Sequence, residues 1–393
     1  MTGRQRLLTA IAGGTPDRVP VTIFIADQGH FLNQMYPDLP AEEALQLQLA
    51  VVGLQKQFGC DVFVRVLYGL MDPLGLIYGG LDVSQQTDTW QVATEEVHEG
   101  PSTIRRSTIR TPEGTLTQDF RIHQQRPGTY CYNCTRHPIR DLRDLAIARR
   151  YEPPMPAGWP EHARRWIATV KAAVGDAGIV GTWSPHGPFN VGSLLVDLDT
   201  LYQAPLADPE FHSRLMEFAI ERSVPYLRAI DAAGVDVHCI GGNVGGGMIG
   251  RRTYEAHLLP YERRYMSIVQ EHGTPGMYHN CGTIMCLLES YKALGARVVE
   301  PFSPPPLGDC TDLQAARRQV GGAYAMLSGI DQVNVLQKGT VDDVRRATER
   351  AMKAGRTGGG FIMQPVDFLE YGTPAENVEA YVQTALEHAD CNV

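Results

Sequence analysis

The stretch PGMYHNCGTIMCLLESYKALGARVVE, residues 275–300, contains the repeating unit that decides the fold. It begins with an apolar run at 275–279 and ends with a second one at 296–300. Both runs are continuous rather than alternating, which is typical of strands buried on both faces of a parallel sheet. Six further runs predict strands at 18–25, 61–66, 178–183, 235–240, 323–329 and 359–363.

Amphipathic helical patterns lie between these runs, for example at 41–58, 208–234, 252–273 and 374–389. Eight strands, each followed by a helix, predict the α/β class and a (β/α)8 TIM barrel, with a doubly wound open sheet as the alternative. We expect residues 1–393 to form one barrel domain, with an insertion at about 85–150. Alternating residues on both sides of the Pro-Glu-Gly turn at 112–114 predict a β-hairpin there, between strands two and three.

Composition narrows the class of function. The chain has 35 Lys and Arg against 44 Asp and Glu, a net charge of −9, which speaks against nucleic acid or an anionic membrane as the main partner. No apolar run approaches ~18 residues, and the first residues are too polar for a secretory signal, so we expect a cytoplasmic protein. In a reducing compartment the eight cysteines should be buried residues or metal ligands rather than disulfides.

Nearly every predicted strand ends in a polar, ligating or titratable residue. In a parallel barrel the chemistry gathers at the C-terminal ends of the strands. One such residue alone is readily explained as a helix cap or a solvated loop residue, but the whole ring predicts a polar cavity. The residues are Asp27, His30, Arg65, His186, Asn243, His279, Cys281, Glu300, Asp331 and Asp367.

His279 and Cys281 carry the most specific chemistry of this ring. Residues i and i+2 of a strand point the same way, so the two side chains should converge at the barrel mouth. An imidazole nitrogen and a thiolate are typical zinc ligands. The alternative is a buried histidine beside an inert cysteine.

Several segments resemble the uroporphyrinogen decarboxylase superfamily, over nearly the full length of the chain. The His-x-Cys after strand five resembles the branch of zinc methyltransferases, which move methyl groups between corrinoid proteins and thiols such as coenzyme M, or take them from methoxylated or methylated donors. The resemblance implies the barrel fold, a Zn²⁺ ion and a corrinoid. Besides 277–300, the segments are RQRLLTAIAGGTPDRVPV (4–21), ADPEFHSRLMEFAIE (207–221), LQAARRQVGGAYAMLSGID (313–331) and GTPAENVEAYV (372–382).

Two departures from the superfamily pattern matter. Its decarboxylases carry arginines just after the first strand, but residues 25–34 read IADQGHFLNQ, so decarboxylation of uroporphyrinogen is not expected. The methyltransferase branch supplies a cysteine as third zinc ligand after strand eight, where this chain has MQPVDFLEYGTP at 363–374. Alignment on Pro365 puts Asp367 at the place of that cysteine, and a carboxylate is an acceptable ligand. Alternatively, Asp367 caps the loop, and Glu300 or water completes the shell.

The sequence therefore predicts a zinc-dependent methyltransferase, and the Asp367 oxygen favours an oxygen donor. We expect His186, Asn243 and Arg65 to orient the substrate, and Asp331 to support them. Asp27 and His30 are further candidates for substrate binding.

We expect the corrinoid on a partner protein. The match of DVHCIG (236–241) to Asp-x-His-x-x-Gly, which would place His238 on cobalt, falls on a barrel strand and is best explained by chance. The alternative functions are a metal-independent decarboxylase or lyase acting on a non-porphyrin acid, and a non-catalytic metal- or corrinoid-binding protein.

Overall fold

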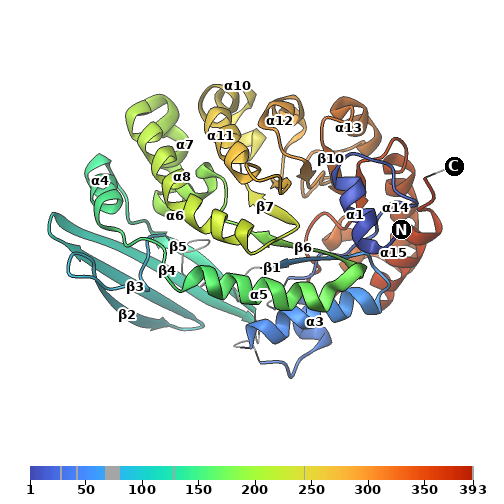
Figure 1. Cartoon of the computed structure of the whole chain (residues 1–393), viewed down its shortest axis with the longest axis horizontal. Helices are drawn as coiled ribbons and strands as arrows, with labels where there is room; N and C mark the ends of the chain where they lie inside the picture. The colour runs from blue at the N-terminus through green and yellow to red at the C-terminus, as the bar shows by residue number, and fades with distance from the viewer. Residues whose placement is uncertain (27–28, 41–42, 67–79, 127–128, 243, 392–393) are drawn as a thin grey trace.

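Seven short parallel strands form one curled sheet (Figure 1). The computed structural model describes residues 1–26, 29–40, 43–66, 80–126, 129–242 and 244–391. The strand order follows the sequence, and every residue of these strands is buried, as a parallel sheet covered on both faces requires. The strands are β1 (Val62–Val66), β6 (Gly178–Trp183), β7 (Val237–Gly241), β8 (Gly276–His279), β9 (Val298–Glu300), β10 (Ala325–Ser328) and β11 (Phe361–Met363).

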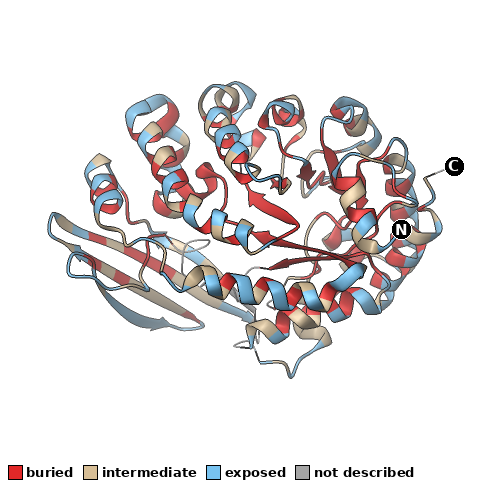
Figure 2. Cartoon of the chain, viewed as in Figure 1, coloured by how far each residue is buried: buried red, intermediate tan, exposed pale blue. Residues whose placement is uncertain are grey.

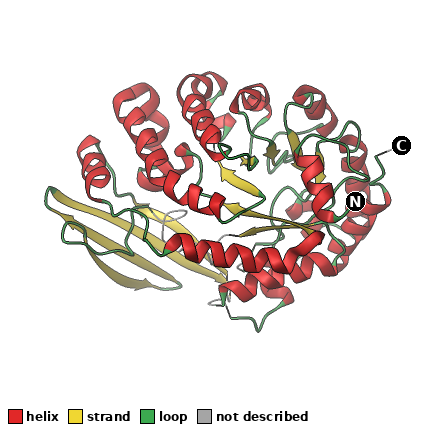
Figure 3. Ribbon diagram, in the orientation of Figure 1, coloured by secondary structure: helices red, strands yellow, loops and turns green. Residues whose placement is uncertain are grey.

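Helices surround this sheet on its outer side, and their inward faces are buried (Figures 2 and 3). The four predicted helices are present, with ends shifted by a few residues. In the described ranges, none of the helices combines the length and apolar character needed to cross a membrane. The helices are α1 (Gly3–Ile11), α2 (His30–Met35), α3 (Ala44–Gln57), α4 (Leu142–Tyr151), α5 (Trp159–Val174), α6 (Pro188–Leu195), α7 (Leu198–Ala207), α8 (Pro209–Ala232), α9 (Gly246–Ile249), α10 (Arg251–Thr253), α11 (Leu259–Val269), α12 (Leu288–Leu294), α13 (Leu313–Val320), α14 (Val341–Gly355) and α15 (Ala375–Glu387).

The prediction of a strand at 18–25 is wrong, because these residues form no strand of the sheet. The segment makes a single parallel bridge, Val21 to Met363 of β11, and lies beside the start of β1 without a ladder. The buried side chain of Gln55 explains why this segment and β1 do not form a ladder, because its carboxamide occupies the place of a strand partner. Its Nε2 donates to the carbonyls of Ile23 and Phe63, at 2.9 and 3.0 Å, and its Oε1 accepts from the Phe63 amide at 2.7 Å.

A second sheet of four antiparallel strands lies between β1 and β6 in the sequence and at the end of the molecule away from both termini (Figure 1). Its strands are β2 (Gln91–Glu99), β3 (Ser102–Thr111), β4 (Gly114–Arg126) and β5 (Thr129–Arg136). The prediction was a hairpin of two strands, whereas this sheet has four. The sequence gives no signal for β2, because eight of its nine residues are exposed and it has no apolar alternation. The single-domain organisation of residues 1–393 stays a prediction.

Candidate metal centre

His279 is the last residue of β8 and faces the inside of the curled sheet. A Cβ on Gly276 would lie 2.4 Å from the sulfur of Met266 in α11, so Gly276 faces the helices. Strand alternation then turns Met277 and His279 inward. The Nε2 of His279 lies 2.9 Å from the Sγ of Cys281, so the predicted convergence of the two side chains is present.

The loop after β8 holds Cys281 at the rim. Gly282 turns the chain with φ 82°, in the region that favours glycine. The next residues of this loop form hydrogen bonds with two neighbouring segments. The amide of Ile284 donates to Asp309 at 2.9 Å, and the amide of Gly247 donates to the hydroxyl of Thr283 at 2.7 Å. Cys281 is therefore exposed but carried on a loop with fixed neighbours.

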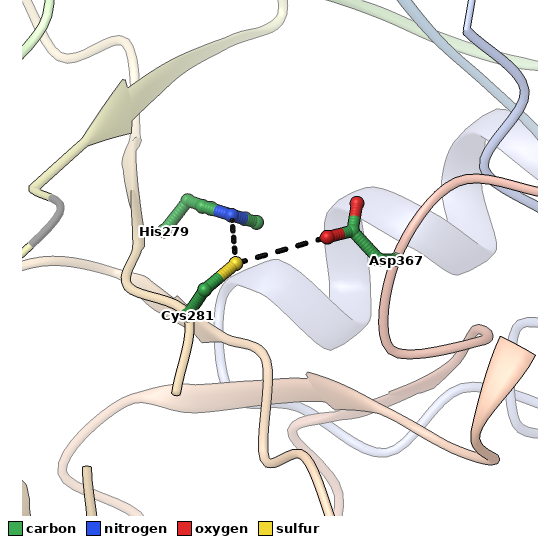
Figure 4. A group of neighbouring side chains, drawn as sticks. All are labelled: His279, Cys281 and Asp367. Carbon is green, nitrogen blue, oxygen red and sulfur yellow. Dashed lines mark hydrogen bonds between the residues drawn. The ribbon is translucent and has the colours of Figure 1, made fainter. Parts of the chain in front are cut away.

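Asp367 joins this pair from the loop after β11. Its Oδ2 lies 3.7 Å from the Sγ of Cys281, and one donor atom of each of the three residues lies within 4.8 Å of the others. Figure 4 shows the three side chains pointing toward one another. Of the four residues proposed as metal ligands, the structure thus brings together His279, Cys281 and Asp367.

The group fits a zinc ion. Zinc bonds of ~2.0–2.3 Å at tetrahedral angles separate neighbouring donors by ~3.4–3.7 Å. The Cys281–Asp367 distance of 3.7 Å already matches this spacing, and the His279–Cys281 distance of 2.9 Å must open by ~0.6 Å. Three protein ligands leave a fourth position, as in catalytic rather than structural zinc sites.

Glu300 and Arg65 lie behind the group rather than in it. Glu300 ends β9, and its Oε1 lies 2.8 Å from Nδ1 of His279, on the side of the ring away from Cys281. Both of its oxygens pair with Arg65 at 2.7 Å. In this structure the two opposite charges are paired with each other, and the roles of Glu300 as an alternative metal ligand and of Arg65 as a substrate contact stay predictions.

Charges set the titration of the protein groups. Burial lowers the pKa of His279, but the negative charges of Cys281 and Glu300 outweigh it, and the net pKa lies well above its usual value. Burial raises the pKa of Glu300, yet Arg65 brings the net value below its ordinary range. Burial raises the pKa of Asp367, an effect that a divalent cation would oppose by favouring the carboxylate.

Aromatic rings stand beside the group. Trp183, at the end of β6, meets the ring of His279 edge-on at 5.2 Å and that of His186 at 5.9 Å. His186 is buried, its Nδ1 accepts from the amide of Gly241 at 3.1 Å, and burial lowers its pKa to about 3. His30 stacks at 4.3 Å on Phe368, the residue after Asp367.

One other described residue of the predicted set, Asp331, is not part of the group. Asp331 accepts hydrogen bonds from the amides of Val333 and Asn334 and caps the helical turn that follows it. A helix cap was the alternative explanation for a single strand-end residue. Asp27 and Asn243 lie outside the described residues.

Sequence reasoning missed Trp183 and Gln364. Gln364 directly follows β11, and its Oε1 accepts from Arg65 at 3.3 Å. Both residues stand at strand ends, so the positional signal existed.

Known proteins resemble this chain at low identity. A methylated-thiol–coenzyme M methyltransferase of Methanosarcina mazei is 25% identical over 201 residues, 51% of each chain. A uroporphyrinogen decarboxylase of Syntrophotalea carbinolica is 31% identical over 160 residues, 40% of this chain and 43% of that protein. A methylcobamide:CoM methyltransferase of M. mazei is 22% identical over 256 residues, 64% and 70% of the two chains. The chain thus spans about half the length of the first two relatives.

Fold and family are shown by two broader matches. The solved structure of a methyltransferase from M. mazei superposes with a TM-score of 0.69 at 19% identity, covering 98% of this chain and 99% of that one, which supports the barrel-like fold. The sequence profile of the uroporphyrinogen decarboxylase (URO-D) family matches residues 131–388. Since this match covers more than half of the 393 residues, the chain belongs to the uroporphyrinogen decarboxylase family.

Proposed function

We propose that this chain is a zinc-dependent methyltransferase that moves a methyl group between a corrinoid protein and a small thiol or a methoxylated or methylated substrate. The observation that carries the proposal is the group of His279, Cys281 and Asp367 at the ends of two parallel strands. Two relatives are coenzyme M methyltransferases by name, which supports the same class of reaction.

The three residues would hold the ion and leave one position for the substrate. When bound there, zinc supplies Lewis acidity, which lowers the pKa of a thiol or makes the heteroatom of a methyl donor a better leaving group. The carboxylate of Asp367 makes the donor set harder than a second thiolate would, and this favours an oxygen donor.

His186 is suited to orient the substrate. Its lowered pKa keeps the imidazole neutral, and because Nδ1 accepts from the backbone, the proton belongs on Nε2, which is then a donor. His30, whose ring lies 4.3 Å from that of Phe368, stays a predicted contact of the substrate. Asp27 and Asn243 stay predicted contacts of the substrate.

The corrinoid would come on another protein. His238 has no exposed surface, and its two ring nitrogens lie 2.8 Å from Ser184 and 3.3 Å from Asp231. Both nitrogens therefore have partners within the fold, which supports a partner protein as the carrier.

A decarboxylase or lyase acting without a metal on a non-porphyrin acid is the second candidate. The observation that favours it is the 31% identity with a uroporphyrinogen decarboxylase. The two candidates differ in their need for metal, because only the methyltransferase should lose its activity when the ion is removed.

Metal analysis tests the proposal directly. We expect about one zinc per chain in the purified protein and none in the double variant His279→Ala/Cys281→Ala, because removing two of three ligands leaves no site. The matched control is His98→Ala/Cys286→Ala, which removes an exposed histidine and an exposed cysteine outside the group and should keep the zinc. Stoichiometric zinc in the first variant would refute the site.

Activity is then measured with methylated donors and thiols in the presence of a corrinoid. Methyl transfer that disappears on chelation and returns with added zinc supports the methyltransferase. Turnover of a carboxylic acid by the chelated protein supports the lyase instead.

A further inference from the structure

The ion pair between Arg65 and Glu300 crosses the interior of the curled sheet. The two parallel contacts, Nη1 to Oε1 and Nη2 to Oε2, are both 2.7 Å, and both side chains are 1% exposed. Residues 65 and 300 lie on β1 and β9, which are not neighbours in the sheet. The pair is therefore a buried, bidentate ion pair that joins two distant strands.

Three aromatic rings fix the guanidinium of Arg65. Its central carbon lies 4.2 Å from the ring centre of Phe24, 4.9 Å from that of Phe63 and 5.3 Å from that of Trp183. A planar cation between ring faces has little freedom to turn. The position of Arg65 thus determines where the carboxylate of Glu300 lies.

Glu300 could pair with either of two cations, the guanidinium of Arg65 or a metal ion bound at the group. Its Oε1 already contacts Nδ1 of His279, in a register that pairs His279 with Glu300 across β8 and β9. A carboxylate so close to the ligands of a zinc ion is itself a suitable ligand. Arg65 and a bound metal would therefore compete for the same two oxygens.

We propose that Arg65 is a positioning residue that keeps Glu300 off the metal. It holds the carboxylate as the acceptor for Nδ1 of His279, which directs Nε2 toward the metal, and it leaves the fourth metal position to the substrate. The inference rests on the proposed function, since it requires a metal at His279, Cys281 and Asp367.

Removal of Arg65 should release this carboxylate. Glu300 would then be a buried charge that has lost its arginine and keeps only the contact with His279, and a metal ion at the group offers it a second cation. In the variant Arg65→Met we expect Glu300 to bind the metal and to occupy the open position. The double variant Arg65→Met/Glu300→Gln removes both charges and should reopen it, while the carboxamide oxygen can still accept from His279.

The test uses Co²⁺ in place of zinc, because its visible spectrum reports the ligands, and 2-mercaptoethanol as the probe for the open position. We expect the wild type to bind the thiol with a new sulfur-to-cobalt band. Arg65→Met should show an altered Co²⁺ spectrum before thiol is added and bind the probe ~10–100-fold more weakly, the range for changes behind a ligand. The double variant should recover thiol binding, and Arg65→Lys should lie between.

A matched control separates positioning from stability. Arg222 and Glu152 form another buried pair, 5% and 7% exposed, outside the metal group. Arg222→Met should lower the thermal midpoint without changing the Co²⁺ spectrum or the thiol affinity. Should Arg65→Met not fold, Arg65→Lys and the double variant still decide the matter through their thiol affinities.

The failures are distinguishable. Wild-type thiol affinity and spectrum in the folded Arg65 variants, or weak thiol binding that persists in the double variant, would overturn the role of Arg65 alone. If the Co²⁺ spectrum of His279→Ala is the same as that of the wild type, the metal site is wrong, and this inference fails with it.

Discussion

Asp367 is the residue at which this chain departs from the pattern it resembles, and the structure places it beside His279 and Cys281. Its carboxylate lies 3.7 Å from the thiol of Cys281, and its other oxygen accepts from the amide of Phe368 at 2.8 Å. The second contact is the loop cap that the sequence left open as an alternative. The two functions are compatible, because a carboxylate has one oxygen for each.

Substitution of Asp367 separates the ligand from the cap. We expect Asp367→Ala to lose metal affinity by at least ~10–100-fold, since even groups behind the ligands have effects of that size. Asp367→Cys should keep the metal. Loss of a cap alone would cost only ~0.5–2 kcal/mol of stability. Zinc affinity is measured by competition with a chromophoric chelator, beside the thermal midpoint.

Asp331→Ala is the control for this comparison, because Asp331 caps a helical turn and is not part of the metal group. It should lower the midpoint and leave zinc affinity unchanged. If Asp367→Ala behaves in the same way, Asp367 is only a cap.

At the residue level, the i, i+2 spacing predicted the convergence of His279 and Cys281, and the resemblance to the methyltransferase branch added Asp367 to them. The partners of Arg65 and Glu300 were out of reach, because these residues are 235 positions apart in the chain and meet only through the curvature of the sheet. A strand-end rule places a residue at the rim but does not say which neighbour neutralises its charge.

At the level of elements, seven of the eight predicted strands are present, and the exception has a local cause. Apolar residues at 18–25 have the composition of a strand, but Pro20 lacks an amide hydrogen and the carboxamide of Gln55 takes over the pairing with Ile23 and Phe63. Pro20 and a glutamine on the buried face of a helix pattern are the signs of this in the sequence.

Gln55 should therefore contribute more to the free energy of unfolding than a glutamine on the exposed surface of the same helix. Gln55→Leu leaves the amide of Phe63 and the carbonyls of Ile23 and Phe63 without this partner, and we expect a loss of at least ~3 kcal/mol, since each buried polar group left unpaired costs ~1–3 kcal/mol. Urea denaturation followed by circular dichroism measures it. Gln57→Leu, at an exposed position of the same helix, is the control and should change stability by less than ~0.5 kcal/mol. Equal losses in the two variants would contradict the bridging role.

For the whole molecule, the pH dependence of stability contains one unusual contribution. Glu262 of α11 is buried, and its Oε1 accepts from the amide of Phe189 at the start of α6, at 3.3 Å. Burial raises its pKa to about 8 from an ordinary 4.5. Between these values the folded chain binds more protons than the unfolded chain, so this contribution to stability is complete below the lower value and decreases as the pH rises toward 8.

Glu262→Gln should remove this contribution. Relative to the wild type, the variant is expected to gain stability from pH 5 to pH 8, by at most ~1.4 kcal/mol per pH unit. Thermal midpoints across this range measure the difference. Glu217→Gln, which changes a more exposed glutamate paired with Arg264, should run parallel to the wild type. A difference between Glu262→Gln and the wild type that stays constant with pH would contradict the assignment.

The architecture as a whole was predictable where hydrophobic pattern and burial agree, as in the parallel strands. It was not predictable in the antiparallel sheet, whose outer strand makes its contacts through the backbone and through charged pairs such as Glu96 with Arg105. Patterns of apolar residues carry no information about such a strand.

That outer strand, β2, has a consequence for solubility. Among the residues that the structure describes, it pairs with β3 on one side only, and an unpaired edge is a template on which another chain can add a strand and begin to aggregate. The exposed residues along it include Glu95, Glu96 and Glu99, and joining a second edge would strip water from all three carboxylates. Each of these carboxylates pairs with an arginine of β3 or β4, and we expect the desolvation of these exposed ion pairs to oppose edge-to-edge association.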